Sequence, residues 1–234
     1  MLLKNLVDKI IFTDAEKAKE IILNLKPNNY VIFIGLHGIS EYLINDNYRK
    51  AVDNSKFIFC DSVFVQLIYM ILYKKIPKKS PGPDVVNLLI KNILLKDKGI
   101  SFFGGDMKVI KRIFKKNNYS KFDIINPGLI DINNISMCNE SKKILKLKYK
   151  YVFVAISCPK QEMIASNFFP YMHGKIVIPV GAAINFYFGI EKRAPLIFRK
   201  LGLEFIWRLA LSPLKMSKRI ILSLHRIFIF LIKR

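Results

Sequence analysis

"YVFVAISCPKQEMIA", residues 151–165, joins the pattern of a buried strand to the start of a helix. Tyr151–Ile156 is a short run of β-branched and aromatic residues, which is typical of a strand inside a sheet. A polar turn interrupts the run, and an apolar pattern resumes from Gln161. A strand followed directly by a helix is the building unit of a parallel α/β sheet, so this stretch predicts that fold.

The same alternation extends along the chain. The expected strands are Val31–Ile34, Phe57–Cys60, Ile100–Phe103, Asp123–Ile125, Tyr151–Ile156 and Lys175–Val180. The expected helices lie near residues 40–53, 62–73, 84–96, 107–117, 139–148 and 161–168. The pattern predicts an α/β fold, with a parallel sheet and helices on both of its faces.

The character of the sequence changes near residue 190. From Ile190 to Arg234 there are 11 Lys or Arg residues and only two acids. We therefore expect a sheet domain over residues 1–189 and a helical, basic appendage over residues 190–234. Ser212 and Pro213 form a cap and first-turn pair, which predicts that a new helix begins there.

This last helix is expected to be amphipathic at about 100° per residue. One half would carry the basic residues Lys215, Lys218, Arg219, His225, Arg226 and Lys233. The other half would carry Ile220, Ile221, Leu224, Ile227, Phe228 and Leu231. Such a helix is typical of one that lies in a membrane interface. The alternative is an ordinary helix that packs on the domain and leaves its cations solvated.

The composition indicates a folded, strongly basic protein. The chain has 234 residues, 52% of them hydrophobic, and a formal net charge of +22. That hydrophobic content supports a full core and argues against global disorder. The charge favours anionic partners such as nucleic acid, acidic lipid headgroups or phosphorylated substrates, although a compositionally biased genome would also raise the lysine content.

The sequence predicts no metal site and no cofactor. Cys60, Cys138 and Cys158 form no CxxC pair, and the three histidines are scattered. These spacings fit a reducing cytosol and do not support a zinc site. We also expect no signal peptide, because acids occur early in the chain, and no transmembrane helix, because no stretch of 18 uncharged apolar residues occurs.

Polar residues follow four of the expected strands, and in an open parallel sheet ligands bind at these carboxyl ends. Asp61 follows the second strand, where it could act as a base or cap the next helix, a role that Ser62 could also fill. Gly104 and Gly105 follow the third strand and permit either close approach of a ligand or a tight turn. Gln161 and Asn185 follow later strands, so all of these residues would share one rim.

The stretch "KKSPGPDVV", residues 78–86, has a Pro-Gly-Pro turn before a helix that Asp84 would cap. Lys79 would lie beside whatever this loop faces. The dinucleotide fingerprint GxGxxG and the P-loop pattern GxxxxGK[ST] do not occur. Their absence argues against a dehydrogenase or a P-loop NTPase.

Taken together, these motifs resemble the WecG/TagA/CpsF family of glycosyltransferases, glycosyltransferase family 26. The resemblance spans about residues 31–219 and is specific only in combination. It rests on Asp61 after its strand and on "PGPD" (81–84), "FFGG" (102–105), "PKQE" (159–162), "VGAAINFYFG" (180–189) and "RAPLIFRKLGLEFIWRL" (193–209).

The resemblance implies a Rossmann-like catalytic domain with a C-terminal appendage that binds the acceptor and the membrane. Such enzymes are inverting and need no metal. They transfer a hexose, most often of the N-acetylmannosamine type, from a UDP-sugar donor to a polyprenyl-diphosphate-linked acceptor in bacterial surface glycan biosynthesis. The chain would be a peripheral protein on an anionic membrane surface, at the cytoplasmic face of the cell membrane.

The resemblance also implies roles for individual residues. Asp61 takes the proposed role of general base. Residues that would contact substrate are Lys79, Asp84, Gly104, Gly105, Gln161, Glu162, Asn185, Arg193, Arg199, Arg208, Lys215 and Arg219. The appendage arginines among them would grip the acceptor diphosphate, and Glu162 would hold the rim in place from behind.

The sequence departs from the family pattern at several positions. Lys79 replaces an arginine, Phe205 replaces a tryptophan, and Ile184-Asn185 replaces Phe-Asp. A loop Asn is also missing near Gly35. These departures leave the transferred sugar open, and they leave a catalytically degenerate scaffold as one alternative. A basic nucleic-acid-binding protein is the other, although cations beside aliphatic residues suit lipid better; self-association of the chain also stays open.

Overall fold

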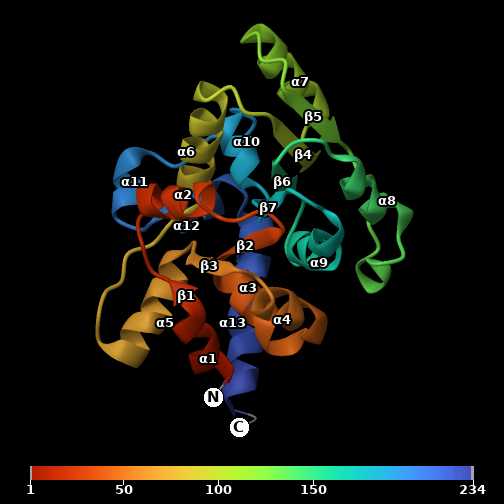
Figure 1. The fold of residues 1–234 in the computed structure, drawn as a ribbon. Helices are drawn as coiled ribbons and strands as arrows, with labels where there is room; N and C mark the ends of the chain where they lie inside the picture. The colour runs from red at the N-terminus through yellow and green to blue at the C-terminus, as the bar shows by residue number, and fades with distance from the viewer. Residues whose placement is uncertain (1, 233–234) are drawn as a thin grey trace.

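The structure is a computed structural model that describes residues 2–232, without the side chains of Lys215 and Leu231. Its centre is a seven-stranded, all-parallel sheet with the order β1-β3-β2-β7-β6-β4-β5 (Figure 1). The strands are β1 (Ile10–Ile11), β2 (Asn29–Ile34), β3 (Phe57–Cys60), β4 (Ile100–Gly104), β5 (Phe122–Ile125), β6 (Tyr151–Ala155) and β7 (Ile176–Pro179). All six expected strands are confirmed, and only the two-residue β1 was missed.

Strand β6 lies in the interior of the sheet, as its sequence predicts. It pairs with β4 on one side, where Phe153 lies beside Phe102, and with β7 on the other, where Val152 lies beside Val177. The side chains of Tyr151, Val152, Phe153 and Val154 are all buried. A strand that is covered on both faces needs apolar residues at consecutive positions, which explains why this run does not alternate.

Helices cover both faces of the sheet, as expected. The α-helices are α1 (Leu2–Lys9), α2 (Ala15–Leu23), α3 (Leu36–Ile44), α4 (Asp46–Asp53), α5 (Val63–Tyr73), α6 (Gly82–Leu95), α7 (Met107–Lys116), α8 (Asn139–Lys142), α9 (Lys160–Phe168), α10 (Ala183–Tyr187), α11 (Leu196–Lys200), α12 (Glu204–Leu211) and α13 (Pro213–Ile232). Helices α2, α6 and α10 pack against one face, while α3, α4, α9 and α13 pack on the other (Figure 1).

Three helix predictions need correction. The expected helix at 40–53 is two helices, because Asn45 ends α3 and its side chain caps α4 by accepting from the Tyr48 N–H at 3.1 Å. The expected helix at 139–148 is the short α8 followed by a 3-10 turn, Lys143–Lys146. Helix α6 begins at Gly82 with Pro81 at the cap position, so Asp84 lies in the first turn and does not cap the helix.

The last helix begins at Pro213, as predicted, and one side of it packs on the domain. Ser223 and Ile227 are buried against the domain, and Arg226 forms an ion pair with Glu41 of α3 at 2.5 Å. The face that points outward carries Ile221 and Phe228, which are 66% and 62% exposed. Glu41 provides a partner for an inward-facing cation, which residues 212–234 alone could not show. The expected positions of Lys233 and of the Lys215 and Leu231 side chains lie outside the described residues.

Across residues 2–232, none of the helices has the length and apolar character that crossing a bilayer would require.

Candidate active site

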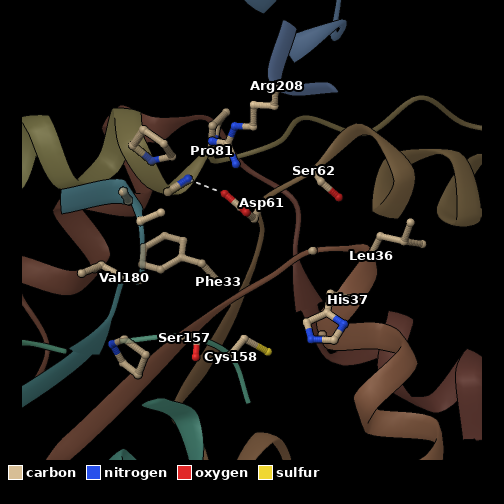
Figure 2. A pocket seen from close by; sticks show the side chains of 18 of the residues that line it. Phe33, Leu36, His37, Asp61, Ser62, Pro81, Ser157, Cys158, Val180 and Arg208 are labelled. Carbon is tan, nitrogen blue, oxygen red and sulfur yellow. Dashed lines mark hydrogen bonds between the residues drawn. The ribbon is translucent and has the colours of Figure 1, made fainter. Parts of the chain in front are cut away.

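A cavity of about 630 Å³ opens where the parallel strands end. Its walls come from two parts of the chain. The ends of β2, β3, β6 and β7, with the loops and helices that follow them, form one wall, and α12 and α13 form the other. Figure 2 shows Asp61 and Arg208 in one part of the cavity and His37 and Cys158 in another. The expected rim is therefore present, and the C-terminal helices close it.

Asp61 follows β3 and lies deep in this cavity. Its backbone N–H donates to the Ile34 carbonyl at 3.0 Å, which fixes the residue beside the end of β2. Its side-chain Oδ1 accepts from the N–H of Gly82 at 2.5 Å (Figure 2). Asp61 thus binds the first residue of α6 and does not cap α5, whose cap position holds Ser62 without a side-chain hydrogen bond.

The environment of Asp61 suits a base. Burial raises the pKa of its carboxyl group, while the Gly82 N–H and the positive charges of Arg208 and Lys79 act to lower it. Within residues 2–232, no hydrogen bond reaches Oδ2. One oxygen is therefore held in place and the other is open to a proton donor, as a general base requires.

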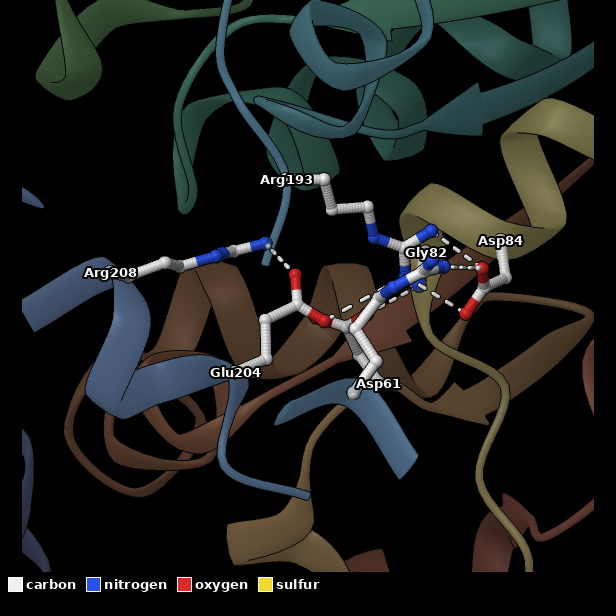
Figure 3. A network of polar contacts seen from close by, with 7 residues as sticks. Asp61, Gly82, Asp84, Arg193, Glu204 and Arg208 are labelled. Carbon is white, nitrogen blue, oxygen red and sulfur yellow. Dashed lines mark hydrogen bonds and ion pairs between the residues drawn. The ribbon is translucent and has the colours of Figure 1, made fainter. Parts of the chain in front are cut away.

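Arginines and carboxylates form a network beside Asp61 (Figure 3). Arg193 donates to both oxygens of Asp84, at 2.5 and 2.8 Å, and Arg199 lies 3.6 Å from the same carboxylate. Glu204 contacts Arg193 at 3.7 Å and Arg208 at 3.1 Å. A bidentate guanidinium–carboxylate pair is geometrically specific, so this network fixes the loop before α11 to the start of α6.

The expected phosphate-binding cations fall into two groups. Arg193 and Arg199 form ion pairs with Asp84. The residues that line the cavity do not include Arg193, Arg199, Asp84 or Gly104. Lys79, Arg208 and Arg219 line it from three different segments. The guanidinium of Arg208 lies 4.8 Å from the centre of the Phe186 ring, a cation–π contact that orients it. The side chain of Lys215 lies outside the described part of the chain.

Gln161 and Glu162, in the first turn of α9, also line the cavity, as the sequence predicts. Both are buried, and Gln161 Nε2 donates to Glu162 Oε1 at 2.8 Å. Burial raises the pKa of Glu162 to about 7, against the lowering effects of that hydrogen bond and of Arg219. Within the described residues, Gln161 Oε1 and Glu162 Oε2 have no hydrogen-bond partner. These atoms leave acceptor capacity that a ligand can use.

The glycine turn after β4 has a steric cause. Gly104 and Gly105 have φ angles of +90° and +81°, a region that favours glycine. A Cβ at Gly104 would lie 2.7 Å from the Ala155 carbonyl oxygen, so Gly104 shapes the turn while Gly105 reaches the cavity. Asn185 also lines the cavity, and its Nδ2 donates to Glu191 at 2.8 Å.

The sequence did not identify His37, Ser223 or Glu204 as parts of this region. His37 lines the cavity at the start of α3, and its Nδ1 lies 3.4 Å from Ser223 Oγ of α13. Burial lowers the pKa of His37. His37 and Ser223 are 186 positions apart, so no local sequence pattern indicates their contact. Glu204 is an acid among basic residues, and that pattern could have identified it. No group of three or more His, Cys, Asp and Glu side chains that could hold a metal occurs within residues 2–232.

A half-buried strand-end carboxylate that shares an open cavity with lysine and arginine side chains is an arrangement that suits group transfer from an anionic substrate. The comparison with known proteins identifies the class. Residues 2–234 match the glycosyl transferase WecG/TagA/CpsF family. The chain belongs to this family and is a glycosyltransferase.

Two similar proteins come from Staphylococcus aureus. In strain NCTC 8325 / PS 47 and in strain MRSA252, the relative is an N-acetylglucosaminyldiphosphoundecaprenol N-acetyl-beta-D-mannosaminyltransferase. Each is 24% identical to this chain over 197 residues, which is 82% of this chain and 76% of the relative.

Proposed function

We propose that this glycosyltransferase moves N-acetylmannosamine from a UDP-sugar donor to an N-acetylglucosamine carried on undecaprenyl diphosphate, with inversion at the anomeric carbon. The Staphylococcus aureus relatives carry the name of this transfer. The observation that supports it most in this chain is Asp61, a half-buried carboxylate with one open oxygen in a cavity lined by cations.

In the proposed reaction, the acceptor hydroxyl oxygen attacks the anomeric carbon of the donor sugar. Asp61 Oδ2 takes the proton of that hydroxyl, and the bond between the anomeric carbon and the β-phosphate oxygen breaks. UDP leaves with the electron pair of that bond. The Gly82 N–H holds Oδ1 throughout, which keeps the carboxylate aimed at the incoming hydroxyl.

The leaving diphosphate gains negative charge as the bond breaks, and fixed cations stabilise it. Arg208 and Lys79 line the part of the cavity around Asp61, and we assign them to this diphosphate. Arg219 lines the cavity from α13 and is assigned to the diphosphate of the acceptor. Gln161 and Glu162 offer hydrogen bonds to sugar hydroxyls or to the uracil edge.

We propose that the chain is organised as a catalytic sheet domain, residues 1–189, and an appendage, residues 190–234, that binds acceptor and membrane. The acceptor diphosphate lies at the surface of the cytoplasmic leaflet, so the cavity must be brought to that surface. The outward face of α13 carries exposed apolar residues, including Leu214, Ile221 and Phe228, with Lys218 also exposed. This combination suits shallow insertion among anionic headgroups.

A donor and acceptor screen tests the proposal. UDP-sugars are supplied one at a time with N-acetylglucosamine-diphosphoundecaprenol, and UDP release and the glycolipid product are measured. We expect the fastest product formation with UDP-N-acetylmannosamine and little change when EDTA is added, because fixed cations hold the diphosphate. A chain that turns over a different UDP-sugar would contradict the proposed sugar. One that turns over none would contradict the proposed transfer.

A further inference from the structure

Helix α5, Val63–Tyr73, contains no charged residue, and yet Val65 is its only buried side chain among those described. Tyr69 packs on Phe12, with ring centres 4.4 Å apart, and Tyr73 donates a hydrogen bond to Asp8. These contacts fix one side of the helix to the N-terminal segment. On the opposite side, Leu67 and Ile71 are exposed within the described residues.

An outward helix face in water normally carries polar side chains, so an apolar one marks an interaction surface. Leu67 is 42% exposed and Ile71 is 67% exposed. Leu72, in the last turn of α5, is 41% exposed, and the apolar surface continues past the helix end to Ile76, which is 83% exposed. Figure 1 shows α5 beside α1 at the lower end of the molecule, the end at which α13 also finishes.

Lysines border this apolar face. Lys74 and Lys75 follow the helix directly, both are exposed, and neither forms an ion pair with any residue in 2–232. Lys78 follows in the same loop and forms an exposed ion pair with Asp14 at 3.0 Å. Two copies of the chain facing each other through this surface would bring these cations together, whereas an anionic bilayer offers both apolar depth and opposite charge.

We propose that the α5 surface, defined as Leu67, Ile71, Leu72, Ile76, Lys74 and Lys75, is a second membrane contact that inserts into an anionic bilayer independently of α13. Residues at the start of α5 and at the end of the following loop, Val63, Phe64 and Lys79, line the catalytic cavity. Insertion of α5 therefore holds the cavity wall that carries Asp61 against the lipid surface. This inference rests on the proposed use of a lipid-linked acceptor.

Two contact points also fix the orientation of the molecule, because one helix alone permits rotation about its axis. Phe64 of α5 packs on Phe205 of α12, with ring centres 5.1 Å apart, so the two contacts are connected through side chains at the cavity. The surface would then do more than add affinity, since it sets which side of the cavity faces the acceptor.

The test measures binding of the full chain to vesicles of phosphatidylglycerol and phosphatidylcholine in equal parts, by co-sedimentation. We expect the double variant Leu67→Gln/Ile71→Gln to lose about tenfold or more in vesicle affinity, because each buried aliphatic side chain contributes strongly. Leu95→Gln, at an exposed position on α6, is the matched control and should bind as the unmodified chain does.

A second variant keeps the test independent of folding. Lys74→Gln/Lys75→Gln should weaken binding to the phosphatidylglycerol vesicles by about tenfold and leave binding to pure phosphatidylcholine unchanged. Its control is Lys115→Gln/Lys116→Gln, an exposed lysine pair at the end of α7.

Several results would overturn the inference. The first is that both α5 variants bind vesicles as tightly as the unmodified chain does. Another is a dimer that Leu67→Gln/Ile71→Gln converts to monomer without a change in vesicle affinity, which would make the surface an interface between copies. Turnover of a short-chain, water-soluble acceptor should be unchanged in the variants, and its loss would also contradict the inference. Failure of the unmodified chain to release UDP would bear on the proposed function alone, because vesicle affinity is measured without substrate.

Discussion

The two walls of the cavity are built in opposite ways. The wall of strand ends holds two carboxyl groups, the half-buried Asp61 and the buried Glu162, whose pKa values are raised by loss of solvent. The wall of α12 and α13 holds solvent-exposed or half-exposed cations, Arg208 and Arg219, among exposed apolar side chains. The difference suggests a division of tasks, in which the rigid core sets the proton chemistry and the C-terminal helices handle phosphate and lipid.

The largest effect is expected at the core wall. Asp61→Asn keeps the size of the side chain and an oxygen that can accept from Gly82, but it removes the base. Transfer should fall on the order of 10²–10⁴-fold, while UDP-sugar still binds. Turnover and donor affinity are measured on the same preparation. Turnover within a few-fold of the unmodified chain would show that Asp61 is not the general base.

The next effect is expected at the helix wall. Arg208→Gln removes the guanidinium that lines the cavity near Asp61, and transfer should fall by about 10²-fold because the leaving diphosphate loses one fixed cation. Initial rates of UDP release check this, with Arg112→Gln on the exposed surface of α7 as the control.

Arg193 sharpens the same comparison because its guanidinium is turned away from the cavity toward Asp84. Arg193→Gln should lower the free energy of unfolding by about 1–3 kcal/mol, since it leaves a half-buried carboxylate without its bidentate partner. Urea unfolding measures it. If Arg193→Gln preserved stability and lost only donor or acceptor affinity, the separation of the two groups of arginines would be wrong.

A smaller effect is expected on the outward face of α13. Ile221→Gln/Phe228→Gln should weaken vesicle binding about tenfold and slow transfer to the lipid-linked acceptor, with donor affinity unchanged. These substitutions are preferable to truncation after Ser212, because α13 covers α3 and its removal would expose that apolar face. Leu129→Gln, in an exposed loop, serves as the control. If Ile221→Gln/Phe228→Gln bound vesicles as well as Leu129→Gln does, this face would have no docking role.

The smallest effect concerns stability and pH. The folded-state pKa of Glu162, about 7, lies above its ordinary value of 4.5, so folding favours the protonated form. Stability is therefore highest below pH 4.5 as far as this group is concerned, and it falls as the pH rises toward 7. Glu162→Gln should remove this loss. The difference in unfolding free energy between the variant and the unmodified chain should therefore be about 1–3 kcal/mol more favourable to the variant at pH 8 than at pH 4.5. Urea unfolding at the two pH values measures this. The same difference between variant and unmodified chain at both pH values would contradict the prediction.

Local pattern predicted the sheet and the positions of its polar rim. Consecutive apolar residues marked the buried strands, and strand ends marked Asp61, Gly105 and Gln161. Long-range contacts were not predictable in this way. Arg193 binds Asp84 because the loop before α11 packs against the start of α6. Arg226 of α13 binds Glu41 of α3, which is distant in the sequence. Helix periodicity finds an apolar stripe and a basic stripe, but it cannot tell that Ser223 and Ile227 will be buried or that Arg226 will meet a distant carboxylate.

The most direct test of the account is the pH dependence of kcat/KM for transfer. If Asp61 is the base, the rate should fall on the acid side with an apparent pKa above the ordinary aspartate value of 3.8, because burial raises the pKa of this carboxyl group. The residual activity of Asp61→Asn should lack that acid limb, while Glu162→Gln should retain it. An acid limb that persists unchanged in Asp61→Asn would show that another group takes the proton, and it would contradict the central claim.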